Sequence, residues 1–349
     1  MSQSRTLSTV VLVSAGLAAS ALVLAGCTGG AGAASGSTAA ASGAPTQTVR
    51  VAVTTGTTTL DLADAEGFFA EHGIDLEVTS LATGTETIAA VQGGSADIAY
   101  ADTFAGANAI SNGFDIAVVA GANYTSPAVS YLVKADSPIR TAADLSGASL
   151  GLGGVPFFRV FANEFLEHAD VDPAAVDFTL VKQGSTLPEA LESGSVDAIQ
   201  SLGFQVAYAN DGTIGYDFRV VGDTDTSEYQ NPDAAQAAFW TTAKWGAANA
   251  DTTQEFANAY REFAAWYNDL GAEDRATHAL ELNKIDYVAL AGGDQEKLEN
   301  LAFRSAAKLI DTPVDAKATQ EWLTTGNTVA PDQVPAGVDI VDALLPSAK

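Results

Sequence analysis

Two hydroxyl residues, Thr85 and Ser185, each stand at the start of an expected short helix in a chain of 349 residues. A helix start leaves backbone N–H groups unpaired, and these groups bind anions together with the helix dipole. The pair therefore predicts one anion-binding position in each half of the chain. Both hydroxyls can also serve as ordinary helix N-caps, so at this stage the two alternatives stay open.

Arg159 is the cation best suited to hold such an anion. It follows Gly153-Gly154 and two Phe residues, in a chain with 16 Lys and Arg against 43 Asp and Glu. Its planar guanidinium can hold a sulfonate or carboxylate through two hydrogen bonds. The alternatives are a side chain that extends into solvent or one that pairs with Glu164. Screening over about 8 Å limits the repulsion between the acidic chain and a free anion.

Regular elements must position these residues, and strand-like and helical patterns alternate along the first half of the chain. This alternation predicts parallel strands joined by right-handed crossovers. Gly73 and Gly93-Gly94 follow two of the helical patterns and are typical of helix ends. The expected elements are strands over 48–53, 74–78 and 97–100, and helices over 60–72 and 85–92.

Residues 84–104 align without gaps with residues 184–204. Each segment contains a loop, a short helix, a Gly turn and a strand, which predicts two related lobes; coincidence between two ordinary αβ units is the alternative. Asp97 and Asp197 begin equivalent strands, and we expect both to be structural. The identical pairs are Gly84/Gly184, Ala90/Ala190, Gly94/Gly194, Ser95/Ser195, Asp97/Asp197 and Phe104/Phe204.

Helical patterns alone follow Trp245. Aromatic residues recur at spacings of three and four in residues 255–270, which indicates the apolar face of a helix that packs in the core. Further helices over 272–327 are expected to cover the first lobe. The aromatic residues of the face are Phe256, Tyr260, Phe263 and Tyr267.

The N-terminus has the parts of a secretory signal peptide: Arg5, a short apolar run and small residues. Its end, Leu24-Ala25-Gly26-Cys27, resembles a bacterial lipobox. The resemblance implies cleavage before Cys27, lipidation of its thiol, and export to the outer face of the cell membrane. An ordinary signal or a membrane anchor beside an inconsequential Cys is the alternative, but the apolar run is shorter than the roughly 20 residues of a spanning helix.

Residues 27–46 form the lipidated Cys and a tether of small residues. As flexible coil, the part after Cys27 spans roughly 24 Å. Removal of residues 1–26 takes away Arg5 and no acidic residue, so the net charge of -27 becomes -28. Such a charge argues against nucleic-acid binding.

No metal site or cofactor is expected from the sequence. The single cysteine excludes an intramolecular disulfide, and the three histidines lack the close ligand spacing of a metal site. We expect two of them, His72 and His168, near helix C-termini, where a cation complements the dipole. The third is His278.

The chain resembles ABC-importer substrate-binding proteins of the nitrate/sulfonate/taurine type, which are related to thiamine-precursor-binding proteins. The likeness implies an α/β, two-lobed periplasmic-binding-protein fold of type 2. In such a fold each lobe has a mixed, mainly parallel sheet flanked by helices, two crossover segments join the lobes, and the C-terminal region is helical. The likeness is carried by Glu66-Gly67-Phe68-Phe69, residues 73–78, residues 94–99, Ala143-Asp144-Leu145-Ser146-Gly147 before Leu150-Gly151, and residues 190–198.

The lobes are expected at residues 47–127 plus 236–349 and at residues 128–235. Ligands of parallel αβ lobes collect at the carboxyl ends of strands and in clefts between domains. This rule selects the candidate ligand-binding residues of both lobes and of the first crossover. They are Thr54, Thr57, Thr58, Thr85, Asp102, Thr103, Phe104, Asn123, Tyr124, Gly154, Phe157, Arg159, Ser185, Phe204 and Gln205.

The resemblance implies a monomeric binding module that delivers a small organic or inorganic anion to an ABC permease and its ATPase. A binder of a thiamine-precursor-like pyrimidine or another heteroaromatic is one alternative, and a lipid-anchored sensor is another. An enzyme is not expected. The chain has no Gly-x-Ser-x-Gly elbow and no Walker loop, and it lacks the clustered Cys and His of related pyrimidine synthases.

Overall fold

Strands and helices alternate along the first half of the chain, as the sequence predicts. Among the described residues, none of the helices is both long and apolar enough to cross a membrane. The computed structural model describes residues 46–54, 57, 59–124, 129–153, 156–181, 186–202, 216–224, 233–304 and 307–349.

The first sheet has five strands in the order β2-β1-β3-β10-β4. Strand β1 pairs in parallel with β2 and β3, whereas β10 pairs antiparallel with both β3 and β4. Four strands therefore run in one direction, and β10 runs against them. The bounds are β1 Gln47–Thr54, β2 Ile74–Leu81, β3 Ile98–Asp102, β4 Ile116–Asn123 and β10 Ala237–Thr242.

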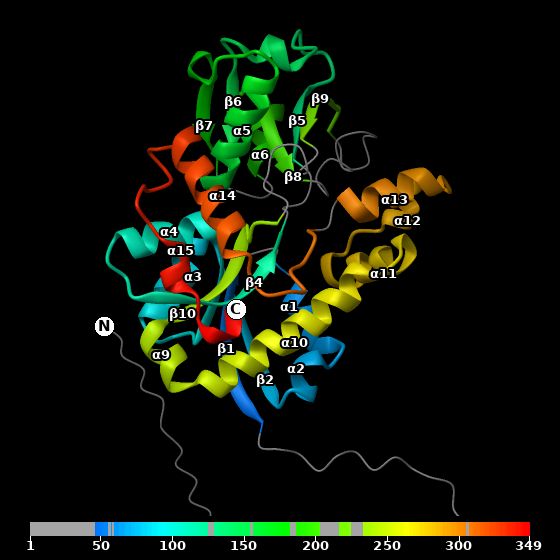
Figure 1. Cartoon of the computed structure of the whole chain (residues 1–349). Coiled ribbons are helices and arrows are strands. Elements are labelled where there is room, and N and C mark those ends of the chain that lie inside the picture. The colour runs from blue at the N-terminus through cyan, green and yellow to red at the C-terminus, as the bar shows by residue number, and fades with distance from the viewer. Residues whose placement is uncertain are drawn as a thin grey trace, which may run out of the picture. The chain divides into compact units, whose positions relative to one another are not determined.

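The second sheet repeats this arrangement in the order β7-β6-β8-β5-β9, with β5 as the antiparallel strand. Figure 1 shows the strands of the two sheets as separate groups. The predicted fold class is thereby confirmed. The bounds are β5 Val129–Lys134, β6 Ser149–Leu152, β7 Asp177–Leu180, β8 Ala198–Leu202 and β9 Phe218–Thr224.

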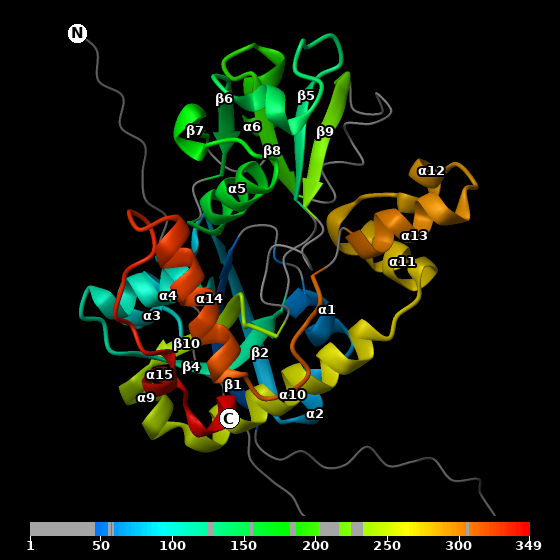
Figure 2. The ribbon, with the colours of Figure 1, turned by 45° about the horizontal axis from the view of Figure 1, so that its top comes forward.

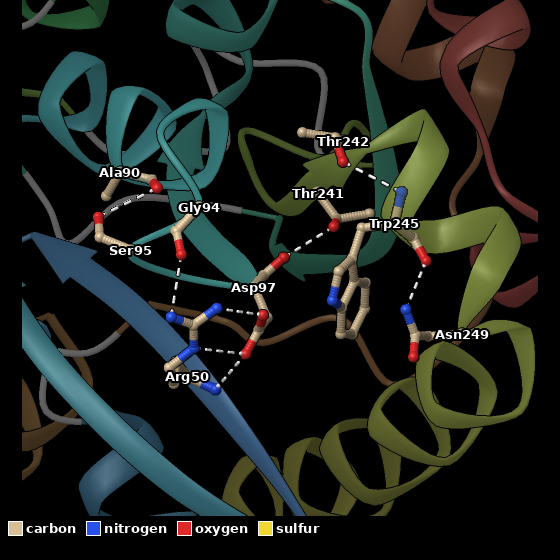
Figure 3. Close-up of polar contacts among 9 residues, drawn as sticks. All are labelled: Arg50, Ala90, Gly94, Ser95, Asp97, Thr241, Thr242, Trp245 and Asn249. Carbon is tan, nitrogen blue, oxygen red and sulfur yellow. Dashed lines mark hydrogen bonds and ion pairs between the residues drawn. The ribbon is translucent and has the colours of Figure 1, made fainter.

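Asp97 and Asp197 each accept a hydrogen bond from the backbone of a neighbouring strand, and both are structural, as the alignment predicts. The Arg50 backbone N–H donates to Asp97 Oδ2 at 3.0 Å, and the Ser149 backbone N–H donates to Asp197 Oδ2 at 2.8 Å. The Arg50 guanidinium also holds Asp97 at 2.7 Å (Figure 3). Burial raises the pKa of Asp97, but the hydrogen bonds and charge of Arg50 outweigh it and lower the pKa overall.

The expected single helix over 60–72 is wrong. Two helices, α1 (Thr59–Ala65) and α2 (Phe68–Glu71), replace it. Gly67 lies between them at φ 88°, a left-handed conformation that glycine adopts readily and that interrupts a helix. Phe69 of α2 is fully buried.

The aromatic face of α10 (Ala250–Asn268) packs in the core, as predicted. Phe256 and Phe263 are fully buried, and Tyr260 Oη donates to the backbone carbonyl of Ala122 at 2.8 Å. The other helices beside the sheets are α3 (Gly84–Gln92), α4 (Thr103–Ser111), α5 (Pro156–His168), α6 (Thr186–Glu192) and α9 (Ala243–Ala248).

The helices that follow α10 contact the first lobe, as expected, through α11 on α1 and α14 on α4, but they do more than cover it. Helices α11, α12 and α13 share a small apolar cluster of their own, and α14 packs on both α4 and α5 (Figure 2). This packing on both helices arises because α14 carries Trp322, which contacts aromatic rings of both α4 and α5. The bounds are α11 Ala272–Asn283, α12 Tyr287–Ala291, α13 Gln295–Arg304, α14 Ala316–Val329 and α15 Ile340–Ala343.

A substitution at Gly106 tests the close packing of α4 on Trp240 of β10. A Cβ atom at Gly106 would lie 2.1 Å from a ring carbon of the fully buried Trp240. Gly106→Ala should therefore lower the free energy of unfolding by about 1–3 kcal/mol, although alanine favours helices. Urea denaturation checks this value, with Ser111→Ala on the exposed end of α4 as the control. A Gly106→Ala protein as stable as the control would contradict the packing.

Candidate functional site at the carboxyl edges of the sheets

The strand register of the first sheet brings several predicted site residues to one edge. Thr54 and Leu81 pair at the ends of β1 and β2. Asp102 and Asn123, at the ends of β3 and β4, both pair with Ala237 of β10. Thr54, Asp102 and Asn123 therefore share the carboxyl edge, as the sequence predicts.

A short segment of chain joins the carboxyl edge of the first sheet to the carboxyl edge of the second sheet. Val129 at the start of β5 pairs with Leu202 and Thr224, the last residues of β8 and β9. Asn123 and Val129 are six residues apart in the chain, which limits their separation to about 20 Å. Two connections, β4 to β5 and β9 to β10, join the two carboxyl edges.

Asp102 is a titratable group at this edge of the first sheet. Its Oδ1 accepts from the backbone N–H of Ala105 at 2.9 Å, which makes it the N-cap of α4. The side chain is buried, and burial raises its pKa to about 6 although backbone hydrogen bonds favour the ionised form. Gly84, at the start of α3, lies beside its other carboxylate oxygen.

Thr85 does not cap α3, so that alternative is wrong. Thr83 is the N-cap, and its Oγ1 accepts from the Glu86 N–H at 3.2 Å. Glu86 in turn accepts from the backbone N–H of Ala82 at 2.8 Å, so the two side chains cap the helix together. Thr85 lies exposed in the first turn, and its part in ligand binding stays a prediction.

Several polar candidates at this edge are engaged by neighbouring residues. Thr54 Oγ1 lies 2.8 Å from Thr57 Oγ1, and Tyr124 Oη lies 2.6 Å from Thr312 Oγ1. Asn123 Oδ1 accepts from Tyr100 Oη at 2.9 Å, and burial raises the pKa of Tyr100 above its ordinary value. The hydroxyl of Thr103 donates to the carbonyl of Ala235.

Two aromatic candidates, Phe104 and Phe157, belong to a row of rings that crosses from α4 to α5. Phe104 stacks on Trp322 with ring centroids 4.8 Å apart, and Trp322 lies 5.9 Å from Phe161. Phe157, in the first turn of α5, lies 5.4 Å from Phe161. Phe104 is buried and Phe157 is half-buried, so Phe104 serves as core here.

Arg159 contacts neither Glu164 nor another acid at hydrogen-bond distance among the described residues. Its Nε donates to Asn163 Oδ1 at 3.0 Å, and its guanidinium lies 3.6 Å from the centre of the Phe178 ring. Burial lowers its pKa, and the charge of Asp332 acts in the opposite direction. This placement on α5 and β7 leaves its contact with a ligand a prediction.

Two of the histidines lie at helix ends, as expected. His168 ends α5, and its Nδ1 lies 2.8 Å from the carbonyl oxygen of Glu164. His72 follows α2 and lies between Glu255 and Glu262 of α10, at 2.8 Å and 3.1 Å. Burial lowers the pKa of His72, but the two glutamates outweigh it and raise the pKa overall.

Six predicted residues fall outside the described residues, and nothing in the structure bears on them. Sequence reasoning also missed Gln200, a buried residue of β8 that pairs with Tyr131. The signal available was a polar residue within the short apolar strand Ala198–Leu202. The predicted residues outside the description are Cys27, Thr58, Gly154, Ser185, Phe204 and Gln205.

Comparison with known families agrees with this architecture. A family model described as NMT1/THI5 like matches residues 54–268, more than half of the chain. The chain belongs to the NMT1/THI5-like family. The resemblance to a known family that the sequence indicated is thereby confirmed. No curated protein compared with the chain matches it.

Solved structures of sulfonate-binding proteins share the fold of this NMT1/THI5-like protein. The alkanesulfonate-binding protein SsuA from Xanthomonas axonopodis pv. citri, bound to MOPS, has 16% identity and a TM-score of 0.63, covering 87% of this chain and 99% of its own. The periplasmic aliphatic sulphonate binding protein SsuA from Escherichia coli has 18% identity and a TM-score of 0.63, covering 86% and 97%.

An enzyme has the same fold. A DszB variant in complex with biphenyl-2-sulfinic acid has 15% identity and a TM-score of 0.58, covering 86% of this chain and 96% of its own. The fold alone therefore does not show whether a protein binds or transforms its ligand. It also does not identify the class of solute.

Asp102→Asn tests the buried carboxyl. Because the folded pKa of about 6 exceeds the ordinary value of 3.8, the folded state binds more protons than the unfolded state between these values. This group therefore makes wild-type stability fall as the pH rises from about 4 to 6. Asparagine also caps helices, so Asp102→Asn should remove that fall. Melting temperatures from pH 4 to 8 give the comparison, and parallel curves for the two proteins would refute the burial effect.

Proposed function

We propose that this chain is the solute-binding component of an ABC importer, which holds a small solute between its two lobes and delivers it to a permease. The observation that carries the proposal is the pairing of two like sheets whose carboxyl edges are joined by two connections. Such edges are where αβ proteins bind ligands, and the sulfonate-binding structures above share this arrangement.

The proposed site draws residues from both lobes. Thr54, Thr57, Asp102 and Asn123 lie at or near the edge of the first sheet, and Phe157 and Arg159 lie in the first turns of α5. Closure of the lobes around a solute would exclude water, which strengthens each polar contact. Our first candidate for the solute is a small anion of the sulfonate, nitrate or taurine class, with a heteroaromatic pyrimidine as the alternative.

Binding, with no bond broken, is the activity we propose. Transport work would come from the permease and its cytoplasmic ATPase. The DszB likeness keeps catalysis as the rival function, and turnover of a bound solute by the purified protein would establish it. A lipid-anchored sensor would bind its solute in the same way but signal to a receptor.

Thermal stability in the presence of candidate solutes tests the binding function. A solute at a hundredfold excess over its Kd should stabilise the folded state by about 2.7 kcal/mol, which raises the melting temperature by roughly 5 °C. The panel comprises taurine, ethanesulfonate, nitrate, a thiamine-precursor pyrimidine and cytosine. Small-angle scattering should show compaction with the same solute. No stabilisation and no compaction with any of them would count against the proposal.

Membrane attachment tests the proposed lipid anchor. Cys27→Ser removes the thiol that lipidation requires, so the protein should leave the membrane fraction and appear in the soluble extracytoplasmic fraction. Fractionation followed by immunoblotting measures this shift, with Ser37→Ala in the tether as the matched control. Retention of Cys27→Ser in the membrane, without detergent, would refute the anchor.

A further inference from the structure

Gln200 holds an unused hydrogen-bond acceptor at the centre of the second sheet. The residue is 1% exposed. Its Nε2 donates to Tyr131 Oη at 3.0 Å and to the carbonyl of Phe158 at 3.1 Å. Its Oε1 is buried and has no hydrogen-bond partner in the part of the chain that the structure describes. The amide cannot simply be turned over, because Oε1 would then face the Phe158 carbonyl and two acceptors cannot form a hydrogen bond.

The place of Gln200 in the sheet is where a ligand is expected. The chain leaves β6 through α5 to reach β7 on one side, and returns through α6 to β8 on the other side of β6. The crevice between β6 and β8 is therefore a topological switch point, and ligands bind outside the carboxyl ends of such strands. Gln200 lies two residues before the end of β8 and bonds to the first turn of α5.

At the equivalent position of the first sheet, the buried polar group has a hydrogen-bond partner. In the alignment of 84–104 with 184–204, Tyr100 corresponds to Gln200. Both face the antiparallel strand of their sheet, Tyr100 opposite Phe239 and Gln200 opposite Tyr131. The Tyr100 hydroxyl is satisfied by Asn123 Oδ1 at 2.9 Å. In the first sheet the Tyr100 hydroxyl thus has a hydrogen-bond partner within the protein. In the second sheet Gln200 Oε1 has none among the described residues.

An open acceptor at such a depth is costly. A buried carbonyl without a donor loses its hydration and gains nothing in return, so such groups are rare in folded proteins. A donor that enters the crevice between β6 and β8 removes this cost. Tight binding would then favour solutes that carry an N–H or O–H group near their charged end.

We propose that Gln200 Oε1 accepts a hydrogen bond from the solute and selects solutes with an N–H or O–H donor over donor-free anions. The inference rests on the proposed binding function and narrows its solute class. It separates taurine and amino-substituted heterocycles from nitrate and simple alkylsulfonates.

Taurine and ethanesulfonate form the matched test pair, since they share the sulfonate and differ by the ammonium donor. Calorimetry of the purified protein should show taurine bound about tenfold more tightly than ethanesulfonate, the usual effect of one such hydrogen bond. Gln200→Met, which removes the acceptor at similar volume, should bring the two affinities within about twofold of each other. Gln200→Asn withdraws the same amide and serves as the second variant if Gln200→Met does not fold.

Gln92→Met is the control variant. Its Nε2 is also buried and unpartnered in the described structure, but Gln92 ends α3, ahead of the amino end of β3. It should leave the taurine preference unchanged. If Gln200→Met weakens both solutes alike, or changes only the melting temperature, an internal water or a structural role explains Oε1 and the inference fails.

The remaining outcomes distinguish this inference from the proposed function. Ethanesulfonate or nitrate bound as tightly as taurine would refute the role of Gln200 and leave the binding function intact. Cytosine bound about tenfold more weakly by Gln200→Met would support that role. Failure of taurine, ethanesulfonate, nitrate and cytosine to bind the wild-type protein would contradict the binding function itself, and the selection by Gln200 with it.

Discussion

The return of the chain to the first sheet through β10 is the constraint on which the architecture depends. Strand β10 lies between β3 and β4 and runs against both. Its entry is held by backbone hydrogen bonds from Thr103 N–H to the Gln236 carbonyl and from Gln236 N–H to the Asn123 carbonyl. Because β10 closes the sheet, the intervening residues must leave and re-enter at the same carboxyl edge. That requirement brings the edges of both sheets within reach of one another.

Helix α14 and the residues that follow it add a second link between the two sheets, on the side of α4 and α5. Asn108 of α4 donates to the Gln333 carbonyl and Asn163 of α5 donates to the Val329 carbonyl, each at 2.7 Å. Trp322 contacts Phe104 and Phe161 from these same helices. Any change in the angle between the sheets must keep or remake the Asn163 and Phe161 contacts.

The two lobes share one aspartate contact and differ in the residue at the position of Tyr100 and Gln200. Asp97 and Asp197 hold the neighbouring strand through the same backbone N–H contact, although only Asp97 gains an arginine partner. By contrast, Tyr100 and Gln200 occupy equivalent positions and differ in whether their polar atoms are satisfied. The repeat thus keeps the aspartate that holds the neighbouring strand and changes the residue at the position of Tyr100 and Gln200.

The sequence alone determined the alternation of elements in the first half of the chain, the apolar face of α10 and the structural role of the two aspartates, while the fold class was implied by the resemblance to a known family. Each of the first three depends on local spacing or on a repeated segment, which a chain displays without folding. Only the tertiary structure decided that Gly67 divides the first helix, that Thr83 and not Thr85 caps α3, and that Arg159 lies on Phe178. Those outcomes depend on which residues lie within contact distance of a side chain in the folded protein. The spacing of residues along the sequence does not encode distances between segments that are far apart in the chain.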